Sequence, residues 1–243
     1  MHTMQVSTKA IVLKMVRYSD KASAVAVFTR EYGRLSLIVY GVSGRKSGSK
    51  AALLQPLSLI ELSMLFHPGK ELQQLKELRS DIALPGISAH PVKNAIALFL
   101  SELFFKTLKH QQEDPALYDF LQYSLEWLNE SVTGIANFHL VLMCRLTRYL
   151  GFEPNMALIG QPWFDLMNGC YCNTQPLHAH CVKPGLLSEF GLLLGCTFSS
   201  MHELNFTRQQ RNELLDILLE YYKLHIPEFH TMQSTEVLHE LFS

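Results

Sequence analysis

The sequence predicts a protein of mixed β + α class, with a five-stranded barrel of the oligonucleotide-binding (OB) type at residues 1–80 and an all-α helical domain at residues 81–243. Two observations support this division. The spacing of apolar residues changes near residue 80 from the two-residue repeat of strands to the three- and four-residue repeat of helices. The charge changes at the same place, since residues 1–80 hold 12 Lys and Arg against 5 Asp and Glu, whereas the rest of the chain holds 9 against 17.

Strand-like patterning fills the first part of the chain. The expected strands are residues 9–18, 22–30, 34–40, 57–66 and 71–78. Gly33 is expected to supply the positive φ of a tight hairpin, and residues 67–69 to form the last turn. Five short antiparallel strands fit a closed barrel, and a five-stranded sandwich is the alternative.

Helical spacing follows a linker at residues 81–88. Helices are expected to begin at Pro91, to follow a cap at Asp114, to cover residues 135–150 and 186–194, and to follow a capping box of Thr207 with Gln210. Residues 152–184 lose this periodicity and are rich in Gly, Pro, Cys, His and Asn. They are therefore expected to form an irregular insert.

The composition limits the class of protein. A hydrophobic content of 48% and a charged content of 18% are typical of globular chains. The sequence contains no apolar run of about 18 residues that could span a membrane. The N-terminal residues lack a signal-peptide pattern and the five cysteines are scattered, so a soluble protein of the reducing cytoplasm is expected.

The positive balance of the first part indicates a polyanionic partner, most often nucleic acid, although a merely basic domain is the alternative. The expected DNA surface consists of basic residues that strand alternation turns outward or that lie in the Gly- and Ser-rich loop at residues 41–50. They are Lys14, Arg17, Lys21, Arg34, Arg45, Lys46 and Lys50. Tyr18 and Tyr40, at strand ends, are candidates for base stacking, whereas Phe28 and Phe66 are expected in the core.

No catalytic residue and no cofactor are predicted. Residues 44–50 read GRKSGSK, which departs from the Walker phosphate loop because Arg follows the first Gly and a strand comes next. The insert holds possible metal ligands at Cys170, Cys172, His178, His180 and Cys181. One residue between the first two cysteines is too few for a zinc knuckle, so no metal site is predicted. Zinc binding by this cluster is the alternative. Asp165 precedes a turn, so no acid is expected near these residues as a general base.

Several motifs carry a resemblance to a known family. They are KAIVLK at residues 9–14, YSDK at 18–21, FTREYGR at 28–34, YGVSGRK at 40–46 and LQPL at 54–57. In order and spacing they resemble the RecO family of bacterial DNA repair and recombination mediators. Beyond residue 80 the resemblance rests on the helical pattern, on the passage from Arg145 to Pro154 and on the position of the insert.

The resemblance implies an N-terminal OB barrel, a helical C-terminal domain and no catalytic centre. It also implies a role in homologous recombination by the RecF pathway, in the cytoplasm at the nucleoid. Such a protein binds single- and double-stranded DNA, displaces single-strand-binding protein, anneals complementary strands and helps RecR to load RecA. Many family members carry four cysteines as a zinc module in the insert, a pattern that this chain does not keep. The competing class is a metal-dependent nucleic-acid-processing enzyme that uses the Cys/His insert.

The negative balance of the helical part favours protein partners. Arg145 and Arg148 are three residues apart on the expected helix, so they share a face, with Val141 and Cys144 beside them. An apolar groove edged by two guanidinium groups suits the C-terminal tail of single-strand-binding protein, which the resemblance implies as a ligand. The alternative is that both arginines form salt bridges to acidic residues of the same domain. If the tail binds elsewhere, Lys106 and Lys109 are the next candidates.

Overall fold

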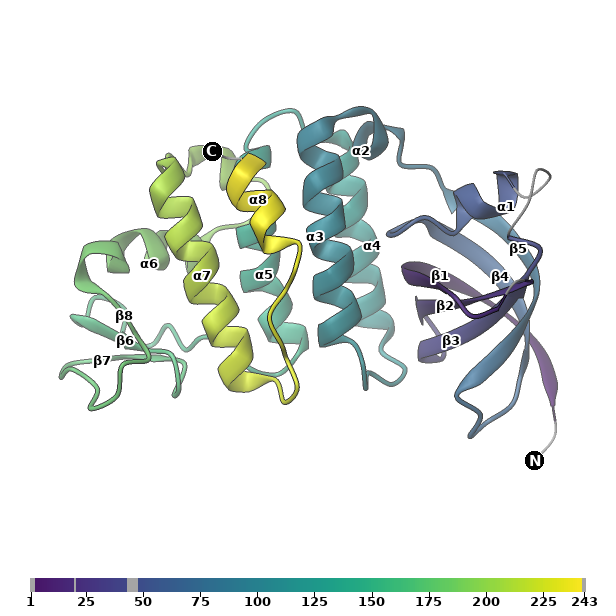
Figure 1. Cartoon of the computed structure of the whole chain (residues 1–243). Coiled ribbons are helices and arrows are strands. Elements are labelled where there is room, and N and C mark those ends of the chain that lie inside the picture. The colour runs from purple at the N-terminus through teal and green to yellow at the C-terminus, as the bar shows by residue number, and fades with distance from the viewer. Residues whose placement is uncertain (1–2, 20, 43–47, 242–243) are drawn as a thin grey trace. The chain divides into compact units, whose positions relative to one another are not determined.

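The computed structural model describes residues 3–19, 21–42 and 48–241. The chain divides into two compact units, Met1–Asn129 and Glu130–Ser243. Figure 1 shows the strands of the barrel and the helices that follow them in the chain. The last barrel strand ends at Ile82, close to the change in charge and periodicity. The first compact unit nevertheless continues through helices that follow the barrel.

Five strands form a closed barrel, which confirms the predicted fold class and excludes the sandwich. They are β1 (Met4–Arg17), β2 (Ala22–Thr29), β3 (Gly33–Tyr40), β4 (Leu59–Phe66) and β5 (Leu72–Ile82), in the order β1-β2-β3-β5-β4. Every pair is antiparallel except β3 with β5, so the expectation of purely antiparallel pairing is wrong at this contact. The reason is geometric, because a ring of five strands cannot alternate direction at every contact.

The barrel interior is filled by alternating apolar side chains. Ala10, Val12, Val25, Val27, Leu37, Val39, Ile60, Leu62 and Met64 are buried together. β1 is longer than expected because its N-terminal part pairs with β4 while its C-terminal part pairs with β2. One strand therefore closes the barrel on two sides.

A short helix, α1 (Gly48–Leu53), occupies the end of the region that was expected to be a loop. Lys, Ala, Ala and Leu follow one another at residues 50–53, and all four have high helix propensity. Leu57, expected at the start of a strand, instead has a φ of +63°, and β4 begins two residues later at Leu59.

Three helices complete the first unit: α2 (Pro85–Ala89), α3 (Pro91–Thr107) and α4 (Pro115–Glu130). α3 begins at the predicted proline, and the Asp114 carboxylate accepts a bond of 2.9 Å from the backbone N–H of Leu117 at the start of α4. The hydroxyl of Ser101 on α3 donates to the carbonyl of Leu13 on β1, at 2.6 Å. This buried hydrogen bond fixes α3 to the barrel.

The second unit is mainly helical. Its elements are η1 (Ile135–Asn137), α5 (Phe138–Tyr149), β6 (Trp163–Asp165), β7 (Cys170–Cys172), β8 (Cys181–Val182), η2 (Pro184–Leu186), α6 (Leu187–Gly195), η3 (Met201–Glu203), α7 (Arg208–His225) and α8 (Thr235–Leu241). The predicted capping box is confirmed, with Thr207 and Gln210 each bonding the other's backbone N–H at the start of α7. Within the described ranges no helix is long and apolar enough to cross a bilayer.

The insert contains regular structure, so its description as irregular is wrong in part. β6 lies between β7 and β8 in a small antiparallel sheet. Phe164, Tyr171 and Val182 are buried in it. Strands of two or three residues are too short to show a periodicity in the sequence, which explains why they were not predicted.

Candidate nucleic-acid interface

The outer face of β1, β2 and β3 carries two rows of side chains at one end of the barrel. Val16 lies opposite Ala24, which lies opposite Ile38. In the next row Ala22 lies opposite Tyr40, and the backbone N–H of Tyr18 donates to the carbonyl of Ala22 at 3.0 Å. Directly paired residues point to the same side of a sheet. Since the neighbouring residues of β2 fill the core, these rows face outward.

Two exposed tyrosines border a strip of small residues on this face. Tyr18 is 66% exposed and Tyr40 is 53% exposed. The central strand β2 presents only alanines between them; Ala24 is partly exposed, whereas Ala22 and Ala26 are buried. We call this surface the alanine track, comprising Val16, Tyr18, Ala22, Ala24, Ala26, Ile38 and Tyr40. Exposed aromatic rings on one face of a sheet are suited to stacking on unpaired bases.

Two predicted DNA-binding cations lie at the inner end of the alanine track, which is the end at Ala26. The ammonium of exposed Lys14 lies 4.9 Å from the centre of the Phe105 ring on α3. The guanidinium carbon of Arg34 lies 4.6 Å from the centre of the same ring. Arg34 is half-buried against α3 and does not point freely outward as expected, and this burial lowers the pKa of Arg34 to about 10.

The remaining predicted cations occupy different positions. Arg17 is exposed, but it lies opposite Ser23 on the core side of the sheet, at the end of the barrel. The expectation that Arg17 faces outward is wrong because a bulge between Val12 and Lys14 reverses the alternation of β1.

Lys21 and Lys50 lie near the outer end of the alanine track, which is the end at Tyr40. Lys21 is exposed in the turn before β2, and its carbonyl accepts a bond of 3.4 Å from the N–H of Gly41. The Lys50 ammonium donates to the carbonyl of Tyr40 at 2.9 Å, so α1 is fixed to the end of β3. Arg45 and Lys46 fall outside the described residues.

The two phenylalanines expected in the core are in different environments. Phe28 is fully buried, but it faces outward from β2 and is covered by α4, where its ring centre lies 6.3 Å from that of Tyr118. Phe66 is partly buried and packs against Tyr32 at 4.7 Å. Helix α4 therefore covers the outer face of β2 at Phe28.

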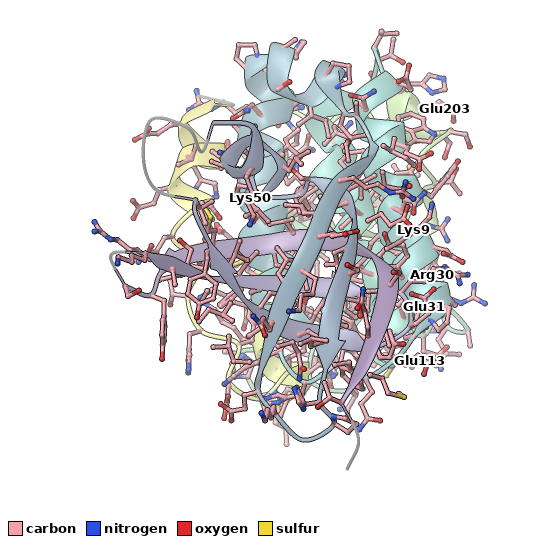
Figure 2. The ribbon with its side chains drawn as sticks, turned by 90° about the vertical axis from the view of Figure 1, so that its right-hand side faces the viewer. Lys9, Arg30, Glu31, Lys50, Glu113 and Glu203 are labelled. Atoms are coloured by element: carbon pink, nitrogen blue, oxygen red, sulfur yellow. The ribbon has the colours of Figure 1, made fainter. Side chains whose placement is uncertain are left out.

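The face of the barrel formed by β1, β4 and β5 has a different character. There Lys9 pairs with Asp81 at 3.0 Å, and Arg79 pairs with Glu61 at 2.6 Å. Figure 2 shows Lys9, Arg30 and Glu31 along one side of the barrel, with Lys50 apart from them on α1. Carboxylates already neutralise these cations, so this face is a poorer site for phosphate than the alanine track.

The two arginines expected to bind a partner differ in accessibility. Arg148 is exposed in the last turn of α5. Arg145 is half-buried, and its Nε donates to the carbonyl of Cys196 at 3.0 Å. Val141 and Cys144 are buried, so the expectation that they line a groove beside the arginines is wrong.

Acidic side chains do approach the cysteines and histidines of the insert, contrary to expectation. Asp165 on the central strand lies opposite both Cys170 and Cys181. The Nε2 atom of His178 lies 3.4 Å from the Asp165 carboxylate. Glu220 on α7 lies 2.6 Å from Nδ1 of His180. Glu220 is forty residues away in the sequence, which is why spacing alone missed this contact.

These residues do not fit the zinc module of the resembling family. The Asp165 carboxylate accepts bonds from the backbone of Met167 and from Asn168, and the Cys172 thiol donates to the carbonyl of Thr174 at 3.3 Å. Burial raises the pKa of the Cys172 thiol, which disfavours the thiolate that a metal requires. Over the described ranges, no group of three His, Cys, Asp or Glu side chains could hold a metal ion.

Comparison with known proteins covers both parts of the chain. The family model described as recombination protein O N terminal matches residues 1–80, and the model described as recombination protein O C terminal matches residues 89–234. A curated protein of Phocaeicola vulgatus named DNA repair protein RecO is 37% identical over 237 residues, covering 97% of this chain and 98% of that protein. Proteins of the same name from Bacteroides fragilis and Porphyromonas gingivalis are 35% and 32% identical, and cover 97% and 98% of this chain and 98% and 100% of their own lengths.

Proposed function

Because the chain belongs to the RecO family of DNA repair proteins, we propose that it is a recombination mediator that binds single- and double-stranded DNA and anneals complementary strands. The observation that carries this proposal is the alanine track, where two exposed tyrosines and several cations share one face of the barrel. We assign DNA binding to residues 1–80 and protein contacts mainly to residues 81–243.

The alanine track supplies two kinds of interaction with a strand. Stacking of bases on Tyr18 and Tyr40 is tolerant of sequence because every base has a π-face. The proposed phosphate contacts come from the basic residues that the sequence predicts, of which Lys14 and Arg34 lie at the track. They are Lys14, Arg17, Lys21, Arg34, Arg45, Lys46 and Lys50. Each contact releases condensed counterions, so affinity should fall steeply with salt.

Annealing follows from the same charges. Two complementary strands repel each other through their phosphates, and a cationic surface that neutralises both reduces this repulsion and keeps them close together. Neither step consumes a nucleotide. This reasoning supports a protein that is a mediator and not an enzyme, acting on DNA in the nucleoid.

DNA binding is tested by fluorescence anisotropy with labelled single- and double-stranded oligonucleotides over a range of salt concentrations. We expect binding to both forms, with log K falling linearly as log salt rises. An affinity that does not change with salt, or the absence of binding at low salt, would contradict the proposal.

The wider role, helping RecR to load RecA on DNA covered by single-strand-binding protein, requires a contact with that protein. We propose that its acidic C-terminal tail docks at Arg148 on α5, with Arg145 as a second contact. The exposure of Arg148 supports this choice. Arg145 already holds the carbonyl of Cys196, so its guanidinium has fewer donors to offer.

A fluorescent peptide with the tail sequence tests this contact. Arg148→Ala should weaken peptide binding severalfold, whereas Lys223→Ala, which removes an exposed cation from α7, should not. Arg145→Ala is a less clean variant because it also breaks the bond to Cys196. Unchanged peptide affinity in Arg148→Ala protein of normal helicity would place the tail elsewhere.

The competing function, a metal-dependent enzyme that uses the Cys/His insert, is disfavoured by the engaged side chains of Asp165 and Cys172. Metal analysis of the purified protein, followed by incubation with labelled DNA and divalent ions, separates the two functions. Stoichiometric metal together with cleavage of the DNA would support the enzyme.

A further inference from the structure

We propose that helix α3 completes the nucleic-acid surface by holding Lys14 and Arg34 over Phe105, where the two cations and Ser36 bind one backbone phosphate. This inference rests on the proposed DNA binding and adds a residue from outside the barrel to it. We call the group of Lys14, Arg34, Ser36 and Phe105 the phosphate cradle.

The two cations share one aromatic ring. Lys14 and Arg34 approach the centre of Phe105 to 4.9 and 4.6 Å, within the range at which a ring face attracts a positive charge. They come from different strands, β1 and β3, and are brought together by a side chain of α3. Each is attracted to the ring, but two positive charges at one ring repel each other.

No carboxylate relieves this repulsion within the part of the chain that the structure describes. Neither Lys14 nor Arg34 forms an ion pair there, whereas Lys9, Arg30 and Arg79 on the barrel all do. The Nη1 atom of Arg34 is buried and has no hydrogen-bond partner among the described residues. A half-buried guanidinium with an unmet donor gains most from a bound anion.

The register of the sheet adds a hydroxyl to the two cations. Lys14 lies opposite Ala26, which lies opposite Ser36 on β3. Arg34 precedes Ser36 by two residues, so both lie on the same face of β3. The small Ala26 side chain thus lies among an ammonium, a guanidinium and a hydroxyl. An ammonium, a guanidinium and a hydroxyl on one face are the kinds of donor that phosphate oxygens accept from.

The position of the cradle favours a phosphate of nucleic acid over the carboxylate of a protein. Ala26 is the innermost alanine of the alanine track, so the cradle continues the row of outward side chains that leads from Tyr18 and Tyr40. A strand whose bases stack on those tyrosines carries its phosphates toward the cradle. Helix α3 thereby limits how far the bound DNA strand can extend along the barrel.

The test measures the affinity of the full-length protein for a fluorescent oligothymidylate. Phe105→Leu removes the ring but keeps an apolar side chain, and we expect affinity to fall about fivefold. Lys14→Ala should lower it similarly and reduce the salt slope by about 0.7. Combining the two changes should cost less than the product of the single effects, since both disrupt one site. Lys70→Ala, which removes an exposed lysine from the turn before β5, is the matched control and should have no effect.

A second readout follows the Arg34 side chain directly. The Nε–H resonance of Arg34 should shift when the oligothymidylate, or inorganic phosphate, is added to the wild-type protein, and should shift much less in Phe105→Leu. If Phe105→Leu fails to fold, Ser36→Ala and Lys14→Ala give the same test with surface changes. Normal oligonucleotide affinity in these variants, with an unmoved Arg34 resonance, would overturn the cradle. A wild-type protein that binds no oligonucleotide would instead contradict the proposed function.

Discussion

The backbone of Gln112, after α3, lies directly against Gly33 in the hairpin between β2 and β3. A β-carbon added to Gly33 would lie 2.5 Å from the carbonyl oxygen of Gln112. Next to this contact, the backbone N–H of Arg34 donates to the carbonyl of Gln111 at 3.0 Å. The close approach therefore fixes the strand that carries Arg34 to the segment that follows the helix carrying Phe105.

Replacing this glycine should destabilise the protein strongly. Gly33 has a φ of +63°, and Gly33→Ala combines a left-handed backbone with a steric clash against a backbone carbonyl. We expect the free energy of unfolding to fall by about 2–4 kcal/mol. Gly41→Ala is the matched control, because Gly41 also has a positive φ but no atom of the described residues lies within 4 Å of a β-carbon added there. That variant should lose only about 1–2 kcal/mol. Urea unfolding measures both, and equal losses would show that the contact with Gln112 is unimportant.

Base stacking on Tyr18 and Tyr40 predicts that their removal lowers the affinity for DNA without changing its dependence on salt. Tyr18→Ala and Tyr40→Ala should each weaken binding to single-stranded DNA by about 1–3 kcal/mol while leaving the salt slope unchanged, since these variants still bind the same phosphates. Tyr123→Ala removes a tyrosine from α4 that is 56% exposed, and should have no effect on DNA binding. A change in all three variants, or in none, would remove the tyrosines from the interface.

The cations Arg45, Lys46 and Lys50 predict a loss of affinity that does change the salt slope. Replacing Arg45, Lys46 and Lys50 together by Ala should weaken binding to all sequences and flatten the dependence of log K on log salt. The expected change in slope is about 0.7 for each phosphate of a single strand that the variant no longer binds. Lys50→Ala alone separates the contribution of the residue that is anchored to Tyr40. An unchanged slope in the triple variant would exclude the loop as a phosphate-binding segment.

Acid should weaken the helical unit through His139 on α5. Burial lowers the pKa of His139 to about 3, and the positive charges of Arg211 and His239 add to this effect. Between this value and the ordinary value of 6.5, the unfolded chain binds a proton that the folded chain does not. The contribution of His139 to stability is therefore complete above pH 6.5 and declines as pH falls.

The expected loss from His139 is about 1.4 kcal/mol for the first pH unit below its ordinary pKa. Urea unfolding at about pH 7.5 and pH 5.5 measures it, in ranges where most carboxylates are ionised. His139→Gln should show a flatter dependence on pH than the wild-type protein. Parallel curves for the two proteins would show that His139 does not titrate in this way.

The sequence was sufficient for the barrel and most helices because their signals are local. Alternation, the Gly33 hairpin, Pro91 and the Thr207 capping box each depend on neighbours in the chain. The parallel contact of β3 with β5 and the bulge in β1 depend on closure of the whole ring, so alternation alone placed Arg17 on the wrong side.

The candidate site was predictable in its residue types but not in its geometry. Tyr18 and Tyr40 were identified from their place at strand ends, and the structure puts both on one face. Phe105 was not identified, because the pattern of an amphipathic helix predicts that its aromatic residues pack in the core. Its contact with two cations required knowledge of how α3 lies on the barrel.

Annealing is the activity that tests the central proposal most directly. Complementary labelled strands are mixed with the wild-type protein without ATP, and with a variant that combines Lys14→Ala, Tyr18→Ala and Tyr40→Ala. We predict that the wild-type protein accelerates duplex formation without nucleotide and that the variant, although folded, does so much more slowly. A strict requirement for ATP, or equal acceleration by the two proteins, would contradict the proposal that this barrel face binds and anneals DNA.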